Sequence, residues 1–296
     1  MLPERLRLAI STLAAAVWLA ACASLAISAP GQRTASFPEA SPSAQIGAQT
    51  GDPIAERSAT LYIFAAASLT EAFEGITRTF EDSHPGTRVV LNFAGSQQLA
   101  QQIIQGAPAD VFASANQKQI DAVIADGRIA PGAAQSFAQN QLVVIVPKDN
   151  PAQITRLQDL SSADLRLVLA AKEVPVGKYS IEFLDKASRD KNFDPAYRAA
   201  VLKNVVSYED NVKAVLSKVA LGEADAGIIY LSDISADNAA RILQIEIPKD
   251  LNVIATYPIA PVQDSANGEL AAAFIALVLS AEGQSSLANY GFIPVK

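Results

Sequence analysis

Short apolar runs alternate with amphipathic segments along most of the chain. From Leu61 onward, runs rich in Val, Ile, Leu and Phe are followed by stretches in which apolar residues recur every three or four positions. The first pattern is typical of buried strands, and the second of helices that cover a sheet. Their repeated alternation predicts an α/β fold.

The predicted strands are 61–65, 88–93, 111–113, 142–147, 167–170, 205–206, 226–230, 242–247 and 253–259. The predicted helices are 69–83, 96–105, 116–126, 161–164, 180–190, 195–202, 210–221, 268–279 and 281–290. Two extended stretches, 141–147 and 252–259, could cross between two lobes. The chain would then form a first lobe from 59–142 and 258–296, and a second from 143–257, in a hinged arrangement. A single continuous sheet is the alternative, and periodicity does not separate the two.

The N-terminal residues have the pattern of a targeting segment. Arg5 and Arg7 precede an apolar stretch, 8–21, that is too short for a good membrane span. It ends in Leu-Ala-Ala followed by Cys22, which resembles the lipobox of bacterial lipoproteins. We therefore expect a lipoprotein signal peptide at 1–22 with lipidation at Cys22, and a simple secretory signal is the alternative. Residues 23–58 are rich in Ser, Ala, Pro, Gly and Gln, which predicts a flexible linker.

Charge and composition exclude several classes of function. The formal net charge is −7, and loss of residues 1–21 makes the chain one charge more negative. An acidic chain without Lys/Arg runs is a poor candidate for binding nucleic acid. Cys22 is the single cysteine and His84, in a polar turn, the single histidine. The folded part therefore has no cysteine for a disulfide, and one histidine in a polar turn makes a Ser-His-Asp triad or a His-rich zinc site a poor expectation.

Two serines follow predicted strands at the point where a helix begins. The strand 61–65 continues into alanines and Ser68, and the strand 88–93 continues through Gly95 to Ser96. Backbone N–H groups in the first turn of a helix lack intrahelical partners, and the helix dipole is positive there. Such a corner can hold an anion without a charged side chain. Each corner alone is also an ordinary N-terminal cap.

Three further segments offer neutral donors. A Pro-X-Gly turn around Val176 precedes the predicted helix 180–190, and the polar residues 207–211 precede Val212. The predicted strand 226–230 ends in Tyr230, whose hydroxyl can donate a hydrogen bond. A fully deprotonated tetrahedral oxyanion has many lone pairs and no donor, so such groups suit it, whereas a carboxylate would demand a protonated ligand. Lys178 is expected at the rim, and Asp110 is expected to make local hydrogen bonds.

Five segments resemble, in order, the molybdate-binding proteins of bacterial ABC importers. They are Phe-Ala-Ala-Ala-Ser-Leu-Thr at 64–70, Phe-Ala-Gly-Ser at 93–96, Gly-Ala-Pro-Ala-Asp-Val-Phe-Ala-Ser-Ala at 106–115, Val-Pro-Val-Gly-Lys-Tyr at 174–179 and Gly-Ile-Ile-Tyr at 227–230. The likeness extends from about residue 61 to the C-terminus. It implies a type II periplasmic-binding-protein fold, in which each lobe is a mixed sheet flanked by helices and two crossing strands join the lobes.

The resemblance also implies the ligand and its contacts. Molybdate, and tungstate alike, would be bound by the hydroxyls of Ser68, Ser96 and Tyr230 and by the backbone amides at Val176 and Val212. It implies no cofactor and no direct metal-ion ligand, and an extracytoplasmic protein that delivers the oxyanion to an ABC permease. We expect a monomer that meets a membrane only through its lipid anchor. The alternatives are the same fold binding sulfate, phosphate or a small organic anion, an enzyme with Ser68 as nucleophile, and a purely structural surface lipoprotein.

Overall fold

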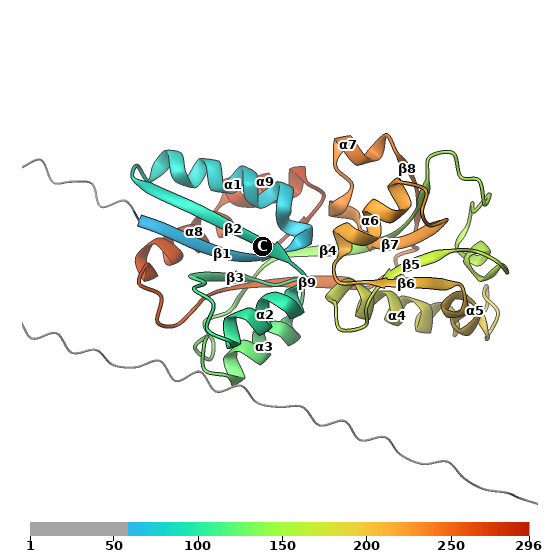
Figure 1. Ribbon diagram of the computed structural model, residues 1–296, viewed down its shortest axis with the longest axis horizontal. Coiled ribbons are helices and arrows are strands. Elements are labelled where there is room, and N and C mark those ends of the chain that lie inside the picture. Colours follow the sequence, from blue (N-terminus) through green and yellow to red (C-terminus); the bar gives the residue numbers. More distant parts are fainter. Residues whose placement is uncertain (1–58, 296) are drawn as a thin grey trace, which may run out of the picture. The chain divides into compact units, whose positions relative to one another are not determined.

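The computed structural model describes residues 59–295, which lie within one compact unit, Ile54–Lys296. The predicted signal peptide, its Cys22 and the predicted linker 23–58 lie outside the described residues. The described part consists of two α/β lobes whose sheets share one long strand (Figure 1). The alternation of strand and helix patterns therefore predicted the fold class correctly.

The first lobe is built on a mixed sheet with the strand order β2-β1-β3-β9-β4. The strands are β2 (Thr87–Ala94), β1 (Ala59–Ala66), β3 (Val111–Ala113), β9 (Ile254–Pro261) and β4 (Gln135–Pro147). The first three are parallel, whereas β9 runs antiparallel to both β3 and β4. The short strand β10 (Ile293–Pro294) also pairs with β4.

Helices cover both faces of this sheet (Figure 1). One face carries α1 (Thr70–Ser83), α8 (Gly268–Leu279) and α9 (Ala281–Asn289), and the other carries α2 (Ser96–Ile104) and α3 (Gln117–Ala125). Successive side chains of a strand point to opposite faces. Accordingly Ile63 of β1 joins the core cluster under α1, and Phe64 joins the cluster with Leu99 of α2. No single helix within 59–295 is long and apolar enough to span a membrane, although α8 and α9, bent by 62°, together meet that test by length and composition.

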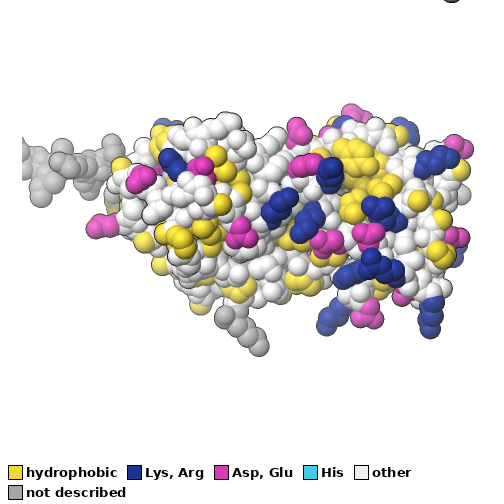
Figure 2. Space-filling view, turned by 90° about the horizontal axis from the view of Figure 1, so that it is seen from below, with side chains coloured by type: hydrophobic (Ala, Val, Ile, Leu, Met, Phe, Trp, Pro, Cys, Tyr) yellow, Lys and Arg dark blue, Asp and Glu magenta, His cyan; other side chains and the backbone are white. Residues whose placement is uncertain are grey.

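The second lobe has the strand order β4-β7-β5-β6, with β8 on the other side of β4. Its strands are β7 (Ala226–Tyr230), β5 (Leu167–Ala170), β6 (Val205–Glu209) and β8 (Ile242–Glu246). The helices α4 (Pro175–Ala187) and α5 (Tyr197–Lys203) lie on one side, and α6 (Val212–Ala220) and α7 (Ala236–Ala239) on the other (Figure 1). Lys and Arg side chains gather over this lobe on the face seen in Figure 2, and fewer lie over the first lobe.

The strand β4 belongs to both lobes. Its residues 135–141 pair with β9, whereas residues from Leu142 onward pair with β7 and β8. At the point of change, the side-chain amide of Asn252 accepts from the N–H of Leu142 and donates to its C=O, each at 2.9 Å. The predicted crossing near 141–147 is therefore confirmed. All of β9 pairs within the first sheet, so residues 254–257 lie there and not in the second lobe to which we assigned them.

Most predicted helices and strands end within two residues of the observed ones, with a few instructive differences. The helix predicted at 180–190 begins at Pro175, because the fixed φ of proline suits the first helical position. The helix predicted at 161–164 is instead the 3-10 turn η2 (Leu157–Ser161). The strand β4 begins at Gln135, seven residues earlier than predicted, because pairing with β9 extends it through polar residues. The short elements η3 (Leu231–Asp233), α7 and β10 were not predicted.

Candidate functional site

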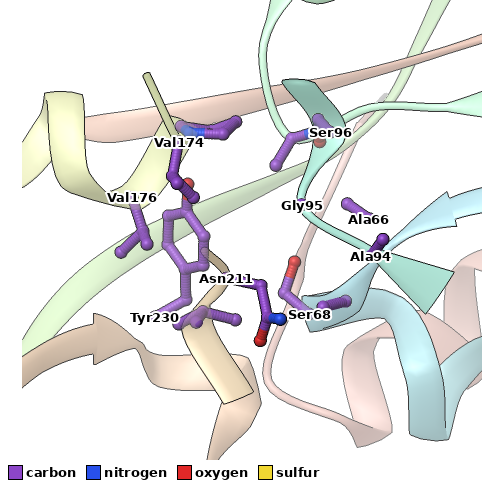
Figure 3. A pocket seen from close by; sticks show the side chains of 13 residues that line it. Ala66, Ser68, Ala94, Gly95, Ser96, Val174, Val176, Asn211 and Tyr230 are labelled. Carbon is purple, nitrogen blue, oxygen red and sulfur yellow. The ribbon is translucent and has the colours of Figure 1, made fainter. Parts of the chain in front are cut away.

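A small cavity lies between the lobes, where strand ends and helix starts from both meet (Figure 3). Its volume is about 10 Å³, room for about one water molecule. That is far below the usual range of about 300–1,000 Å³ for sites that hold drug-sized ligands, so it suits a small ion at most. The thirteen residues that line it are Ala, Gly, Ser, Val, Pro, Asn and Tyr, so none of them is charged.

All five residues predicted for the site line this cavity. Ser68 lies in the 3-10 turn η1 (Ala67–Leu69) between β1 and α1, and Ser96 is the first residue of α2. From the second lobe come Val176 in the first turn of α4, Val212 as the first residue of α6, and Tyr230 at the end of β7. The structure brings these residues together, while their contact with a ligand stays a prediction.

Three helices begin at the cavity, and their first-turn N–H groups and dipoles are suited to an anion. The Pro-X-Gly segment, which we predicted as a turn before α4, is instead the first turn of that helix. Its Gly177 packs against the end of β5, because a Cβ there would lie 2.1 Å from the carbonyl oxygen of Ala171. At the start of α6, the side chain of Asn211 accepts from the N–H of Ala214 at 3.1 Å and so caps the helix.

The hydroxyl of Ser68 is part of a buried hydrogen-bond network that runs beneath the cavity. Its Oγ lies 2.9 Å from the hydroxyl of Tyr257 on β9. The side-chain amide of Asn140 on β4 donates to the Tyr257 hydroxyl at 3.4 Å and to the Oγ of Ser232 at 2.7 Å. The network therefore connects the first-lobe serine through both central strands to η3 of the second lobe.

Ser96 is held differently. Its Oγ accepts a hydrogen bond from the backbone N–H of Ala115 at 3.0 Å. The neighbouring Gly95 allows the lobes to approach closely, because a Cβ at this position would lie 2.4 Å from the carbonyl oxygen of Asp210. The side chain of Gln97 donates to that same carbonyl at 2.9 Å. The start of α2 thus touches the second lobe directly.

Tyr230 presents a buried hydroxyl without a partner. Its side chain is 1% exposed, and the hydroxyl oxygen has no hydrogen-bond partner among the described residues. Burial raises its pKa well above 10, so the group is a neutral hydroxyl at physiological pH. The Tyr230 ring packs edge-on against that of Tyr257, with centroids 5.8 Å apart. Figure 3 shows the Tyr230 side chain lying along one side of the cavity. A buried polar group without a partner is rare, and this one lines the cavity.

Charged groups meet beside the cavity but outside its lining. The ammonium of Lys213 on α6 lies 2.8 Å from both carboxylate oxygens of Glu71 on α1 and 3.3 Å from Asp233 Oδ1. Burial, the largest cause, raises the pKa of Asp233 to about 6 although Lys213 opposes this. Burial on its own would lower the pKa of Lys213, but Asp233 and Glu71 outweigh it and the pKa is raised. The Lys213–Glu71 contact joins the two lobes.

Three other residues considered in the sequence lie away from the cavity lining. Lys178 pairs with Glu182 at 3.5 Å on the surface of α4. Asp110 accepts hydrogen bonds from the N–H of Tyr62 and from Ser265, the local role that we predicted. His84 stacks on Phe80 in the turn after α1, with ring centroids 4.0 Å apart. Within 59–295, no three His, Cys, Asp or Glu side chains gather in a way that could hold a metal ion.

A small uncharged cavity between two α/β lobes that share a crossing strand is the arrangement of a solute-binding protein, in which lobes close on a ligand. Residues 61–293 match the family described as bacterial extracellular solute-binding protein, and the chain belongs to that family. The predicted type II periplasmic-binding-protein fold is thereby confirmed.

The relatives of this chain include binders of an oxyanion. The chain is 36% identical over 233 residues to the molybdate-binding protein ModA of Mycobacterium tuberculosis strain H37Rv. The match covers 79% of this chain and 84% of that protein. It is 31% identical over 238 residues to the putative ABC transporter substrate-binding lipoprotein YvgL of Bacillus subtilis strain 168, with 80% and 87% covered. The solved structure of the sulfate-binding protein SubI of Mycobacterium tuberculosis H37Rv matches with a TM-score of 0.71 at 17% identity. The match covers 80% of this chain and 88% of that one, and it supports the fold alone.

Sequence reasoning missed the residues behind the cavity wall. Tyr257 and Asn140 lie in strands whose apolar neighbours mark them only as core positions, and the contact between Ser68 and Tyr257 spans 189 residues of sequence. The pairing of Glu71 with Lys213 spans 142 residues, and no local pattern marks it. These contacts depend on how the lobes meet, so no local signal could have predicted them.

Proposed function

We propose that this protein captures molybdate, and tungstate alike, in the cavity between its lobes and delivers it to an ABC permease. The observation that carries the proposal is the uncharged cavity lined by the hydroxyls of Ser68, Ser96 and Tyr230. Relatives at 36% and 31% identity that are named for molybdate binding and for ABC transport support the choice of ligand and of partner.

The proposed contacts are neutral hydrogen bonds. The three hydroxyls and the backbone amides at Val176 and Val212 donate to the oxyanion, with helix dipoles adding to the favourable field. Each hydrogen bond to a charged group contributes about 1.5–3 kcal/mol. Several of them together give tight binding without a buried countercharge, whose desolvation would be costly. The role needs no cofactor.

Isothermal titration of the purified protein tests the ligand. We expect molybdate and tungstate to bind tightly, and sulfate and phosphate to bind at least tenfold more weakly. Tight sulfate binding without heat from molybdate would favour the same fold serving another oxyanion. Ser68→Ala and Ser96→Ala should each weaken molybdate binding by about tenfold or more, as a hydrogen bond to a charged group is lost. Unchanged affinity in both variants would remove these serines from the site.

The surroundings of Ser68 support a binding role over a catalytic one. A nucleophilic serine requires an adjacent general base. The group that contacts Ser68 Oγ is the hydroxyl of Tyr257. Burial raises the pKa of Tyr257 well above 10, so it is a neutral phenol at physiological pH and supplies no phenolate to take the serine proton. A hydrolytic turnover abolished by Ser68→Ala while oxyanion binding persists would contradict the proposal.

The proposal extends to location and assembly. We propose a monomer that stands outside the cytoplasm and is held at a membrane by a lipid on Cys22. The Bacillus subtilis relative, which is named as a putative lipoprotein, supports the anchor. Cys22→Ser should release the full-length protein from the membrane fraction of a bacterial host and abolish incorporation of labelled fatty acid. A variant that stays in the membrane fraction and still incorporates fatty acid would contradict the anchor.

Light scattering tests the monomer. We expect a single mass equal to that of one chain.

A further inference from the structure

The partners in the buried network below the cavity favour one direction of hydrogen-bond donation. The Oδ1 of Asn140 accepts from the backbone N–H of Gln141 at 3.0 Å, which fixes the orientation of the amide. Its Nδ2 group, a donor only, therefore faces Ser232 Oγ at 2.7 Å and the hydroxyl of Tyr257 at 3.4 Å. Tyr257 accepts from Asn140, so its own proton is left for another partner.

That partner is Ser68. The hydroxyl of Tyr257 lies 2.9 Å from Ser68 Oγ, and its side chain is fully buried. The Tyr257 ring is held edge-on between those of Phe137, Tyr230 and Phe292, with centroids 5.4 to 6.2 Å away, so the hydroxyl has a fixed position. Donation from Asn140 to Tyr257 and from Tyr257 to Ser68 is therefore the arrangement that gives the buried Tyr257 proton an acceptor. The proton of Ser68 is then free to point into the cavity.

Ser96 reaches the same state by another route. Its Oγ accepts from the N–H of Ala115, which is a donor only, so the proton of Ser96 is also free for the cavity. The Tyr230 hydroxyl has no partner among the described residues. All three hydroxyls can therefore present protons to a ligand. A serine that instead accepted a hydrogen bond from the ligand would leave a buried hydroxyl proton of this network without an acceptor, which is unfavourable.

We propose that Asn140 and Tyr257 are positioning residues that fix Ser68 as a donor toward the cavity, and so favour oxyanions that carry no proton. The inference rests on the proposed function, and it assigns the discrimination against protonated anions to two residues outside the cavity lining. Sulfate and hydrogen phosphate are the matched probes, because they have nearly the same size and the same charge and differ by one proton.

The decisive variant is Asn140→Asp. A carboxylate at this position only accepts hydrogen bonds, so Tyr257 would donate to it. The Tyr257 oxygen would then accept a hydrogen bond from Ser68, and the Ser68 oxygen could accept one from the ligand. The experiment is titration at about pH 8 of the wild type, Asn140→Asp and Tyr257→Phe with molybdate, sulfate and phosphate. Denaturation of each ligand-free protein checks that it is folded.

We expect Asn140→Asp to lower the ratio of sulfate to hydrogen phosphate affinity by tenfold or more, while the ratio of molybdate to sulfate stays within threefold. Tyr257→Phe should weaken molybdate and sulfate about tenfold, and hydrogen phosphate less. A uniform loss for all three anions, or a folded Asn140→Asp variant that binds sulfate but not hydrogen phosphate, would overturn the inference. Loss below twofold in Tyr257→Phe would do the same. Absence of molybdate binding by the wild type would instead overturn the proposed function.

Discussion

Replacing Tyr230 by Phe should change stability and binding in opposite directions. In the ligand-free protein, the hydroxyl is buried without a partner, and such a group costs about 1–3 kcal/mol of desolvation. The variant removes this cost and keeps the ring, so we expect the free energy of unfolding to rise by about 1 kcal/mol. Packing against Tyr257 is unchanged, because the ring makes that contact.

The same substitution removes a proposed donor to the anion. Loss of a hydrogen bond to a charged group, about 1.5–3 kcal/mol, corresponds to molybdate binding that is about 10- to 150-fold weaker. Urea denaturation of the ligand-free protein gives the first quantity and isothermal titration the second. An unfolding free energy that falls, together with an unchanged affinity, would refute the assignment of this hydroxyl to the ligand.

Tyr197→Phe is the matched control. Tyr197 is equally buried, but its hydroxyl donates to the carbonyl of Leu157 at 2.6 Å, away from the cavity. Its removal leaves that carbonyl without its partner, so we expect stability to fall by about 1–3 kcal/mol and the affinity for molybdate to stay unchanged. The two variants therefore separate the loss of a buried hydroxyl as such from the loss of one that faces a ligand.

Three further predictions concern contacts around the cavity. Glu71→Gln removes the charge that pairs with Lys213 across the lobes. Because the pair is only partly buried, we expect molybdate binding to weaken by about 1 kcal/mol, measured as faster release in stopped flow. An unchanged release rate would contradict this. Gly95→Ala should abolish molybdate binding in titration but leave the free energy of unfolding little changed. The reason is that the added Cβ would meet the carbonyl of Asp210 only when the lobes are together. Full affinity for molybdate would contradict this prediction. The raised pKa of Asp233, about 6 against 3.8, means that the folded state binds more protons between these values, so stability falls by about 3 kcal/mol as pH rises through that window. Asp233→Asn should lack that slope in denaturation at a series of pH values, and an identical slope would contradict the prediction.

The sequence predicted those parts of the fold and site that depend on local patterns. The apolar run before Ser68 and the glycine before Ser96 mark strand ends and helix starts, because strand periodicity, small residues and helix capping act over a few neighbouring residues. The start of α4 was misplaced because proline is typical both of turns and of the first helical position. Tyr257 could not be predicted as a partner of Ser68, because the pairing of β9 with β3 and β4 brings them together across most of the chain.

The side chain of Asn252 has a mechanical consequence. Where β4 leaves one sheet and enters the other, Leu142 bonds to this amide side chain through both its N–H and its C=O. A side chain can follow a change in backbone direction that would break the register between two paired strands. We therefore expect the crossing point to keep these two hydrogen bonds when the angle between the lobes changes. The balance between open and closed lobes would then depend on the Glu71–Lys213 and Gln97–Asp210 contacts and on the bound anion, more than on the connecting strand.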